Sequence, residues 1–189
     1  ELYDSRDEMA VITRNVIAQI EFLNTYTDKE KDILGKYSSS LFTLNTFYTA
    51  NKLIIGHNVG DSAEKFLVKF WSSVVEHMRL WQELQNREIT KVDLRENFIA
   101  IQSIVIQAFG RIGNYFFTNE IDSGMCLEKI ENINWSRSSK QWYMRAISKN
   151  GRIITNKKAA MLIANEIKKE IGIPLSHEEE DAEVQVKKY

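Results

Sequence analysis

A single proline, Pro174, among 189 residues is the feature that most narrows the folds open to this chain. Proline breaks the interior of helices and is common in turns, so its near absence favours long helices. The apolar residues agree with this, because in most segments they recur at spacings of three and four, which place them on one face of a helix. The sequence therefore predicts an all-α fold.

The expected helices follow from this apolar spacing and from capping residues at their ends. They cover about residues 4–20, 27–34, 41–55, 61–84, 91–118, 125–132, 140–148 and 157–171. Asp4 or Ser5 is expected to cap the first helix, and Thr27 with Glu30 has the capping-box spacing for the second. Asn156 is expected to cap the last one.

The helix expected at about residues 91–118 differs from the others. It is apolar around well over half of its circumference, so it is expected to lie buried at the centre of an irregular helical bundle. Gly110 and Gly113 lie inside it, although each glycine weakens a helix by roughly 1 kcal/mol relative to alanine. Either they let another backbone approach closely, or they mark a break after Phe109.

Composition disfavours several classes of protein. Cys126 is the only cysteine, which excludes a disulfide or a thiolate zinc cluster within the chain and fits a reducing compartment. No apolar run is long enough for a transmembrane helix, so no membrane span is expected. The chain begins at Glu1 without an initiator Met or a secretion signal, which indicates a fragment of a larger, cytoplasmic protein.

The sequence shows no catalytic constellation. It has no Gly-rich phosphate loop, no pair of histidines one helical turn apart and no nucleophile elbow. His57, His77 and His177 lie in different segments, and His77, beside an apolar stripe, is interpreted as a partly buried structural residue. No catalytic residue, metal site or cofactor is therefore predicted. Enzyme activity of this chain alone is disfavoured, although the residues do not decide the question.

Charge is divided unevenly along the chain. Residues 1–134, the acidic body, hold 14 lysines and arginines against 19 acidic residues, a balance of −5. Residues 135–175 form the basic segment, in which residues 135–169 hold nine cations and one acid, a balance of +8. Residues 176–189 are acidic again and are expected to be a mobile tail. We expect one domain, in which a basic helical subdomain packs on the acidic body.

The basic segment is the strongest functional signal, because nucleic-acid binding needs cations that meet phosphates and hydroxyls that fix the register. The residues expected to contact DNA are Arg137, Lys140, Arg145, Lys149, Arg152, Lys157, Lys158, Ser136, Ser138 and Ser139. Lys157 and Lys158 would begin a helix, where cations oppose the helix dipole, so local stability does not explain them. The alternative is a solvated basic face that docks on the acidic body or on the acidic tail.

Two other features of the basic segment are weaker signals for DNA binding. Trp135 and Trp142 are interpreted as core anchors rather than as platforms for base stacking. The helices expected on either side of the turn at Asn150-Gly151 have the size of a helix-turn-helix, but many helix pairs share that size.

Four stretches of sequence resemble the DndB family of DNA sulfur modification proteins. They are Leu2-Tyr3-Asp4-Ser5-Arg6-Asp7, Ser40-Leu41-Phe42-Thr43-Leu44, Gln107-Ala108-Phe109-Gly110-Arg111-Ile112-Gly113 and Ile133-Asn134-Trp135-Ser136-Arg137-Ser138. The resemblance runs in order from about Leu2 to Leu175. It implies the C-terminal helical part of a larger protein of the bacterial phosphorothioation system, which replaces an oxygen of the DNA backbone by sulfur. The family is associated with DNA binding and with control of the modification genes. Its Asp-Gly-Gln-His-Arg motif is absent from this chain, so no activity of that motif is expected here.

These observations lead to three hypotheses about function. In the first, the chain is a regulatory helical domain that binds double-stranded DNA through the basic segment. In the second, it is a scaffold that docks the N-terminal half of its own protein or another DNA sulfur modification protein. In the third, Arg111 contacts a phosphate in an enzyme site that the rest of the protein completes.

Overall fold

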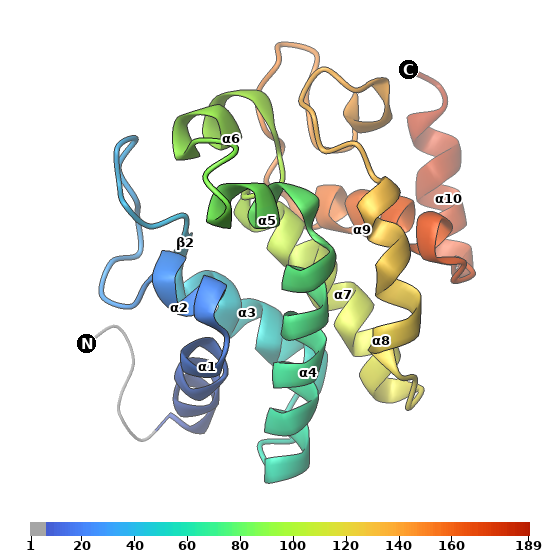
Figure 1. Ribbon diagram of the computed structural model, residues 1–189. Coiled ribbons are helices and arrows are strands. Elements are labelled where there is room, and N and C mark those ends of the chain that lie inside the picture. Colours follow the sequence, from blue (N-terminus) through green and yellow to red (C-terminus); the bar gives the residue numbers. More distant parts are fainter. Residues whose placement is uncertain (1–6) are drawn as a thin grey trace.

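The predicted all-α fold is confirmed by the computed structural model, which describes residues 7–189 apart from the side chain of Met125 (Figure 1). The α-helices are α1 (Glu8–Gln19), α2 (Glu21–Tyr26), α3 (Leu44–Ile55), α4 (Asp61–His77), α5 (Arg79–Gln85), α6 (Lys91–Asn97), α7 (Ser103–Thr118), α8 (Ser123–Cys126), α9 (Lys157–Ile171) and α10 (His177–Val186). Two 3₁₀ helices, η1 (Leu127–Asn132) and η2 (Lys140–Trp142), and two short parallel strands, β1 (Thr27–Asp28) and β2 (Phe42–Thr43), complete the elements. No helix within residues 7–189 is long and apolar enough to cross a membrane.

Helix α7 lies at the centre of the bundle, between α3 and α9 (Figure 1). Nine of its 16 residues are buried, as its nearly continuous apolar surface predicts. A Cβ atom on Gly110 would lie 3.3 Å from the Cα of Ala50 in α3, and one on Gly113 would lie 2.8 Å from the Ile54 side chain. Of the two alternatives for these glycines, the close approach of another helix is therefore the one that the structure contains.

The prediction of one continuous helix at residues 91–118 is wrong in one respect, because this stretch forms two helices, α6 and α7. The chain between them leaves the helical conformation to pair with the start of the basic segment. The amide of Ile99 donates to the carbonyl of Trp135 at 2.9 Å, and the amide of Arg137 donates to the carbonyl of Asn97 at 2.9 Å. Tertiary hydrogen bonds here replace those that a continuous helix would make.

The helix expected at residues 61–84 is divided as well, at Met78 between α4 and α5. Gln82 Nε2 donates to the carbonyl of Val75 at 2.7 Å, so a side chain satisfies a carbonyl near the end of α4. At the N-terminus, Asp7 caps α1 by accepting from the amides of Met9 and Ala10. The expected caps Asp4 and Ser5 lie outside the described residues.

Two of the expected helices are wrong. After β1, the Asp28 carboxylate accepts from the amides of Glu30 and Lys31, both at 2.9 Å, and this turn replaces the helix expected at residues 27–34. Between residues 140 and 148 only η2 is helical, because the amides of Ala146 and Ile147 both turn back to the carbonyl of Trp142. A helix at residues 140–148 is therefore absent, and with it the helix-turn-helix suggested for this segment.

The prediction that residues 176–189 form a mobile acidic tail is wrong, and the difference changes how charge is distributed in the fold. This segment forms helix α10, which begins with a capping box of Ser176 and Glu179 and packs on α9. Glu179 and Glu183 of α10 are buried, with 3% and 5% of their surface exposed. Buried carboxylates need cationic or hydrogen-bonding partners, and α9 and the basic segment supply them.

Candidate nucleic-acid interface

The basic segment is anchored to the core by its two tryptophans. Trp135 and Trp142 are buried and stack with ring centroids 5.3 Å apart and an interplanar angle of 6°. Trp142 Nε1 donates to the carbonyl of Asn134 at 2.7 Å, which satisfies the polar edge of the buried indole. The interpretation of both residues as core anchors is confirmed.

Arg137 and the neighbouring serines hold the local backbone. Arg137 Nη2 donates to the carbonyl of Arg95 at 2.8 Å and its Nε to the carbonyl of Phe98 at 3.3 Å. These bonds satisfy carbonyls at the end of α6, as cationic side chains often do at helix C-termini. Ser136 Oγ and Ser138 Oγ lie 2.9 Å apart and bond to each other. Three residues expected to contact DNA thus have partners within the fold.

Arg145 is buried and paired within the fold, although it also lines a cavity beside α10. Its side chain is 9% exposed and forms a two-point ion pair with Glu183 of α10, and Glu166 of α9 lies 3.2 Å away. Lys169 also contacts Glu183, at 2.9 Å. The expected role of Arg145 as a phosphate contact does not fit this position, because a bidentate carboxylate already occupies its guanidinium.

A second buried pair joins α9 and α10 in the same way. Lys168 Nζ lies 2.9 and 3.0 Å from the two carboxylate oxygens of Glu179. Burial alone would raise the pKa of Glu179, but hydrogen bonds from the backbone of Ser176 and from Lys168 lower it. For Glu183, burial likewise acts to raise the pKa, and hydrogen bonds from Arg145, Lys169 and Asn165 outweigh it and lower the pKa to about 2. We call Arg145, Lys168 and Lys169 the inner cations because each pairs with a carboxylate; Arg145 and Lys168 are buried, whereas Lys169 is partly exposed.

The remaining cations are exposed and surround the start of α9. Ser148 Oγ accepts from the amide of Arg152 at 3.2 Å and closes the turn that carries Lys149 and Arg152. Lys149 Nζ lies 5.1 Å from the ring centroid of Tyr189. Tyr189 in turn lines a cavity of about 420 Å³ together with Lys158 and Lys188.

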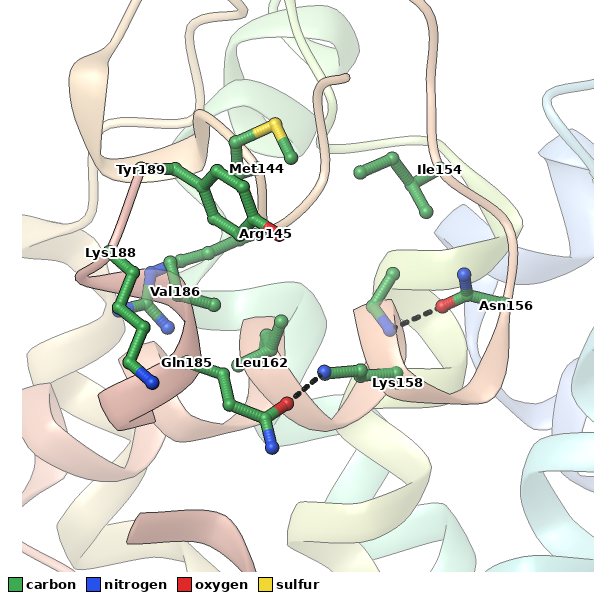
Figure 2. A pocket seen from close by; sticks show the side chains of 11 residues that line it. Met144, Arg145, Ile154, Asn156, Lys158, Leu162, Gln185, Val186, Lys188 and Tyr189 are labelled. Atoms are coloured by element: carbon green, nitrogen blue, oxygen red, sulfur yellow. Dashed lines mark hydrogen bonds between the residues drawn. The ribbon is translucent and has the colours of Figure 1, made fainter. Parts of the chain in front are cut away.

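Figure 2 shows this cavity, with Lys188 following α10 at one edge, and Lys158 of α9 bonded to Gln185. Apolar side chains, among them Leu162, Val186 and Ile154, form part of its lining. We call five exposed cations, at the turn before α9, in its first turn and after α10, the basic rim; Lys158 and Lys188 among them line this cavity. Its members are Lys149, Arg152, Lys157, Lys158 and Lys188. Lys140, in η2, is also exposed.

A family model for DndB, described as DNA-sulfur modification-associated, matches residues 1–174 of the chain. The chain belongs to the DndB family. No curated protein and no solved structure matches it. Membership links the chain to DNA sulfur modification. The matched residues include the acidic body and nearly all of the basic segment, whereas α10 lies beyond them.

One part of the candidate interface of this DndB-family chain was missed by sequence reasoning. Lys188, Gln185 and Tyr189 line the same cavity as Lys158, although they belong to the segment interpreted as an acidic tail. The pair Lys187-Lys188 was a usable signal, because two adjacent cations follow the run of acids that ends at Glu183. Only the folding of α10 back onto α9 places them beside the basic segment.

Arg111 lies apart from the basic rim, in α7. Its side chain is 32% exposed, and its Nη2 atom lies 3.9 Å from Glu179, which Lys168 already holds at a shorter distance. It lines a different cavity, which also borders the start of α9. Within the described part of the chain, no group of three or more His, Cys, Asp or Glu side chains is arranged to hold a metal ion. His77 bonds to Glu131 at 2.8 Å, which fits its interpretation as a structural histidine.

Proposed function

We propose that this DndB-family chain binds double-stranded DNA through the basic rim and acts as a regulatory, DNA-binding helical part of a DNA sulfur modification protein that controls the modification genes. The observation that supports this proposal most is a difference in pairing. Each inner cation contacts a carboxylate, whereas no cation of the basic rim has a carboxylate partner within residues 7–189. Exposed cations without carboxylate partners keep a positive charge that no acid of the fold neutralises, and this charge can attract phosphates.

The arrangement of the rim suits a phosphate backbone. Lys149 and Arg152 lie on one turn that Ser148 closes, so their spacing is fixed by the backbone. Lys157 and Lys158 occupy the first turn of α9, where they oppose the helix dipole and lower the stability of the helix. A bound polyanion would reverse this unfavourable interaction. Arg137 and Arg145 contribute to the proposed interface by positioning the segment rather than by contacting DNA.

The decisive measurement is the salt dependence of DNA affinity. For duplex DNA, each phosphate that a protein cation neutralises contributes about −0.9 to the slope of log K against log salt concentration. We expect the triple variant Lys149→Gln, Lys157→Gln, Lys158→Gln to neutralise two to three fewer phosphates, so its slope should flatten by roughly 2 to 3. The measurement is a fluorescence-anisotropy titration of a labelled duplex at several salt concentrations.

A matched control variant makes the same change in net charge at lysines outside the basic rim. Lys52, Lys65 and Lys129 are exposed lysines of the acidic body. Their triple Gln variant should bind DNA with the slope of the unmodified chain. If the two triple variants changed the slope equally, the proposed interface would be refuted, because only net charge would then matter.

A second candidate function, a scaffold within the modification system, is favoured by one observation. Ile33 and Tyr37, between β1 and β2, have 85% and 82% of their surface exposed. Exposed apolar side chains of this size suit docking against the N-terminal half of the same protein or against another DNA sulfur modification protein. In the full-length protein, a photo-crosslinker at either position should then capture the N-terminal half. If the activated crosslinker reacted only with water and formed no crosslink to the N-terminal half, that half would be excluded as the partner.

A further inference from the structure

A second cavity borders the start of α9 and shares Asn156 with the cavity lined by Lys158 and Lys188. Its volume is about 420 Å³, within the range of small-molecule sites. Thr49 and Leu53 of α3, Ile104, Gln107 and Arg111 of α7, and Thr155, Asn156, Lys157 and Ala160 at the start of α9 line it. Lys157 faces this cavity, whereas its neighbour Lys158 lines the other one.

The central helix provides the floor of this cavity. Ile104, Gln107 and Arg111 are spaced by three and four residues, so they share one face of α7. Gly110 lies within the same stretch, and the close contact of its backbone with Ala50 brings α3 near enough to form a wall. The residues from Gln107 to Gly113 thus have two roles. The glycines let helices pack closely, and the side chains of Gln107 and Arg111 line a cavity.

Arg111 is incompletely satisfied within the fold. Its Nε atom is buried and has no hydrogen-bond partner. Its nearest carboxylate, Glu179, is 3.9 Å from Nη2 and is engaged by Lys168 at 2.9 Å. A buried donor without an acceptor is unfavourable, and such groups in folded proteins call for an acceptor such as a bound ion or ligand. Lys157, the second cation of the cavity, is exposed and has no carboxylate partner among residues 7–189.

We infer that this cavity binds a phosphate monoester whose organic group lies against the apolar wall. The guanidinium of Arg111, after a rotation that presents its Nε and Nη2 edge, would bind two phosphate oxygens at once. Lys157, at the start of α9, adds a second positive charge to the lining of the cavity. Leu53, Ile104 and Ala160 would cover the organic group, and bare phosphate makes no use of them. Lys157 belongs to both this site and the basic rim, whereas Arg111 lines only this cavity and so distinguishes the two proposals.

Adenosine monophosphate and inorganic phosphate are the probes, measured by isothermal titration calorimetry on the full chain. We expect saturable binding of adenosine monophosphate, with inorganic phosphate weaker by about tenfold or more because it leaves the apolar wall uncovered. Arg111→Gln and Lys157→Gln should each weaken adenosine monophosphate by about tenfold or more. Lys158→Gln is the matched control, one residue away and outside the cavity, and should change the affinity by less than about twofold.

Leu53→Trp tests the wall without altering charge. It should reduce the affinity for adenosine monophosphate and leave that for inorganic phosphate unchanged, with thermal unfolding confirming that each variant is folded. A 5′-phosphorylated oligonucleotide that displaces adenosine monophosphate, where the unphosphorylated strand does not, identifies a DNA strand end as the source of the phosphate monoester. Failure to displace identifies a free small molecule.

Two results would overturn the assignment of this site. One is the absence of saturable binding of adenosine monophosphate at millimolar concentration. The other is an equal loss of affinity in Lys157→Gln and Lys158→Gln, which would indicate a general effect of charge. Arg111→Gln separates this inference from the DNA proposal, since it should leave the salt dependence of DNA binding unchanged.

Discussion

The inner cations and most of the basic rim come from the same basic segment, yet they differ in whether a carboxylate pairs with them. Arg145, Lys168 and Lys169 contact carboxylates of α9 and α10, while Lys149 and Lys157 have no carboxylate partner within residues 7–189. The difference lies in α10, which brings two buried glutamates to one side of α9 only. A net charge summed along the sequence therefore overstates the positive surface available to a polyanion.

The two groups of cations also differ in what they contribute to stability. A buried ion pair from which one partner is removed leaves an uncompensated charge, which destabilises a protein by roughly 3–5 kcal/mol. An exposed cation without a partner contributes almost nothing to folding. Substitutions should therefore separate the groups, with large effects on unfolding in the inner group and effects on binding in the rim.

The largest effect is expected from Glu183→Ala. Glu183 accepts hydrogen bonds from Arg145, Lys169 and Asn165, so its removal leaves Arg145 buried beside Glu166 alone. We expect the free energy of unfolding to fall by about 3–5 kcal/mol in urea titrations followed by circular dichroism. Glu180→Ala, an exposed change on the same helix, should stay within about 0.5 kcal/mol. Similar losses of stability in the two variants would contradict the division between inner and exposed charges.

Acid should protonate the carboxylates that pair with the inner cations and so break these ion pairs, while the rim cations stay charged. The folded pKa of Glu183, about 2, lies below its ordinary value of 4.5, so its contribution is fully present above about pH 4.5. This contribution is lost as the pH falls towards 2, and a shift of this size corresponds to about 3 kcal/mol. Urea unfolding at a series of pH values measures it. In Glu183→Gln the slope between these pH values should be smaller, and an unchanged slope would show that other carboxylates dominate.

A smaller loss of stability is expected when the start of α10 is weakened. Ser176 Oγ accepts from the amide of Glu179, and Glu179 in turn accepts from the amide of Ser176. Ser176→Ala removes half of this capping box and should destabilise the chain by about 1 kcal/mol. Ser62→Ala, on an exposed residue of α4, is the control. If the same destabilisation also appears in an Arg145→Met, Glu183→Leu background, capping and ion pairing contribute independently.

Local sequence signals predicted the elements that local interactions decide. The cap at Asn156, the turn at Asn150-Gly151 and the burial of α7 and of both tryptophans all appear in the structure. The failures have non-local causes. The break after Asn97 depends on hydrogen bonds to residues 135–137, which no pattern within residues 91–118 announces.

The same limit applies to the candidate site. The basic residues were visible in the sequence, but their division into inner cations and basic rim was not. That division depends on α10, whose acidic residues look like a solvated tail until Glu179 and Glu183 meet their partners. The residues next to Arg111 in the sequence show no cluster of charges that would mark a site. Its cavity forms only because α3, α7 and α9 converge.

The smallest effect on stability should have the opposite sign. Lys157 begins α9 and opposes the helix dipole, so Lys157→Glu should stabilise the chain by about 0.3–1 kcal/mol while weakening DNA binding. Thermal unfolding and the DNA titration, measured on the same sample, test both parts. Lys168→Glu makes the same change of charge at an inner cation and should instead destabilise the fold, because it sets two carboxylates side by side. If reversing the charge of a rim lysine stabilises the fold, that lysine does not serve folding, and a role in DNA binding would account for it. If Lys157→Glu lowered stability as Lys168→Glu does, the rim would have a structural role, and its separation from the inner cations would fail.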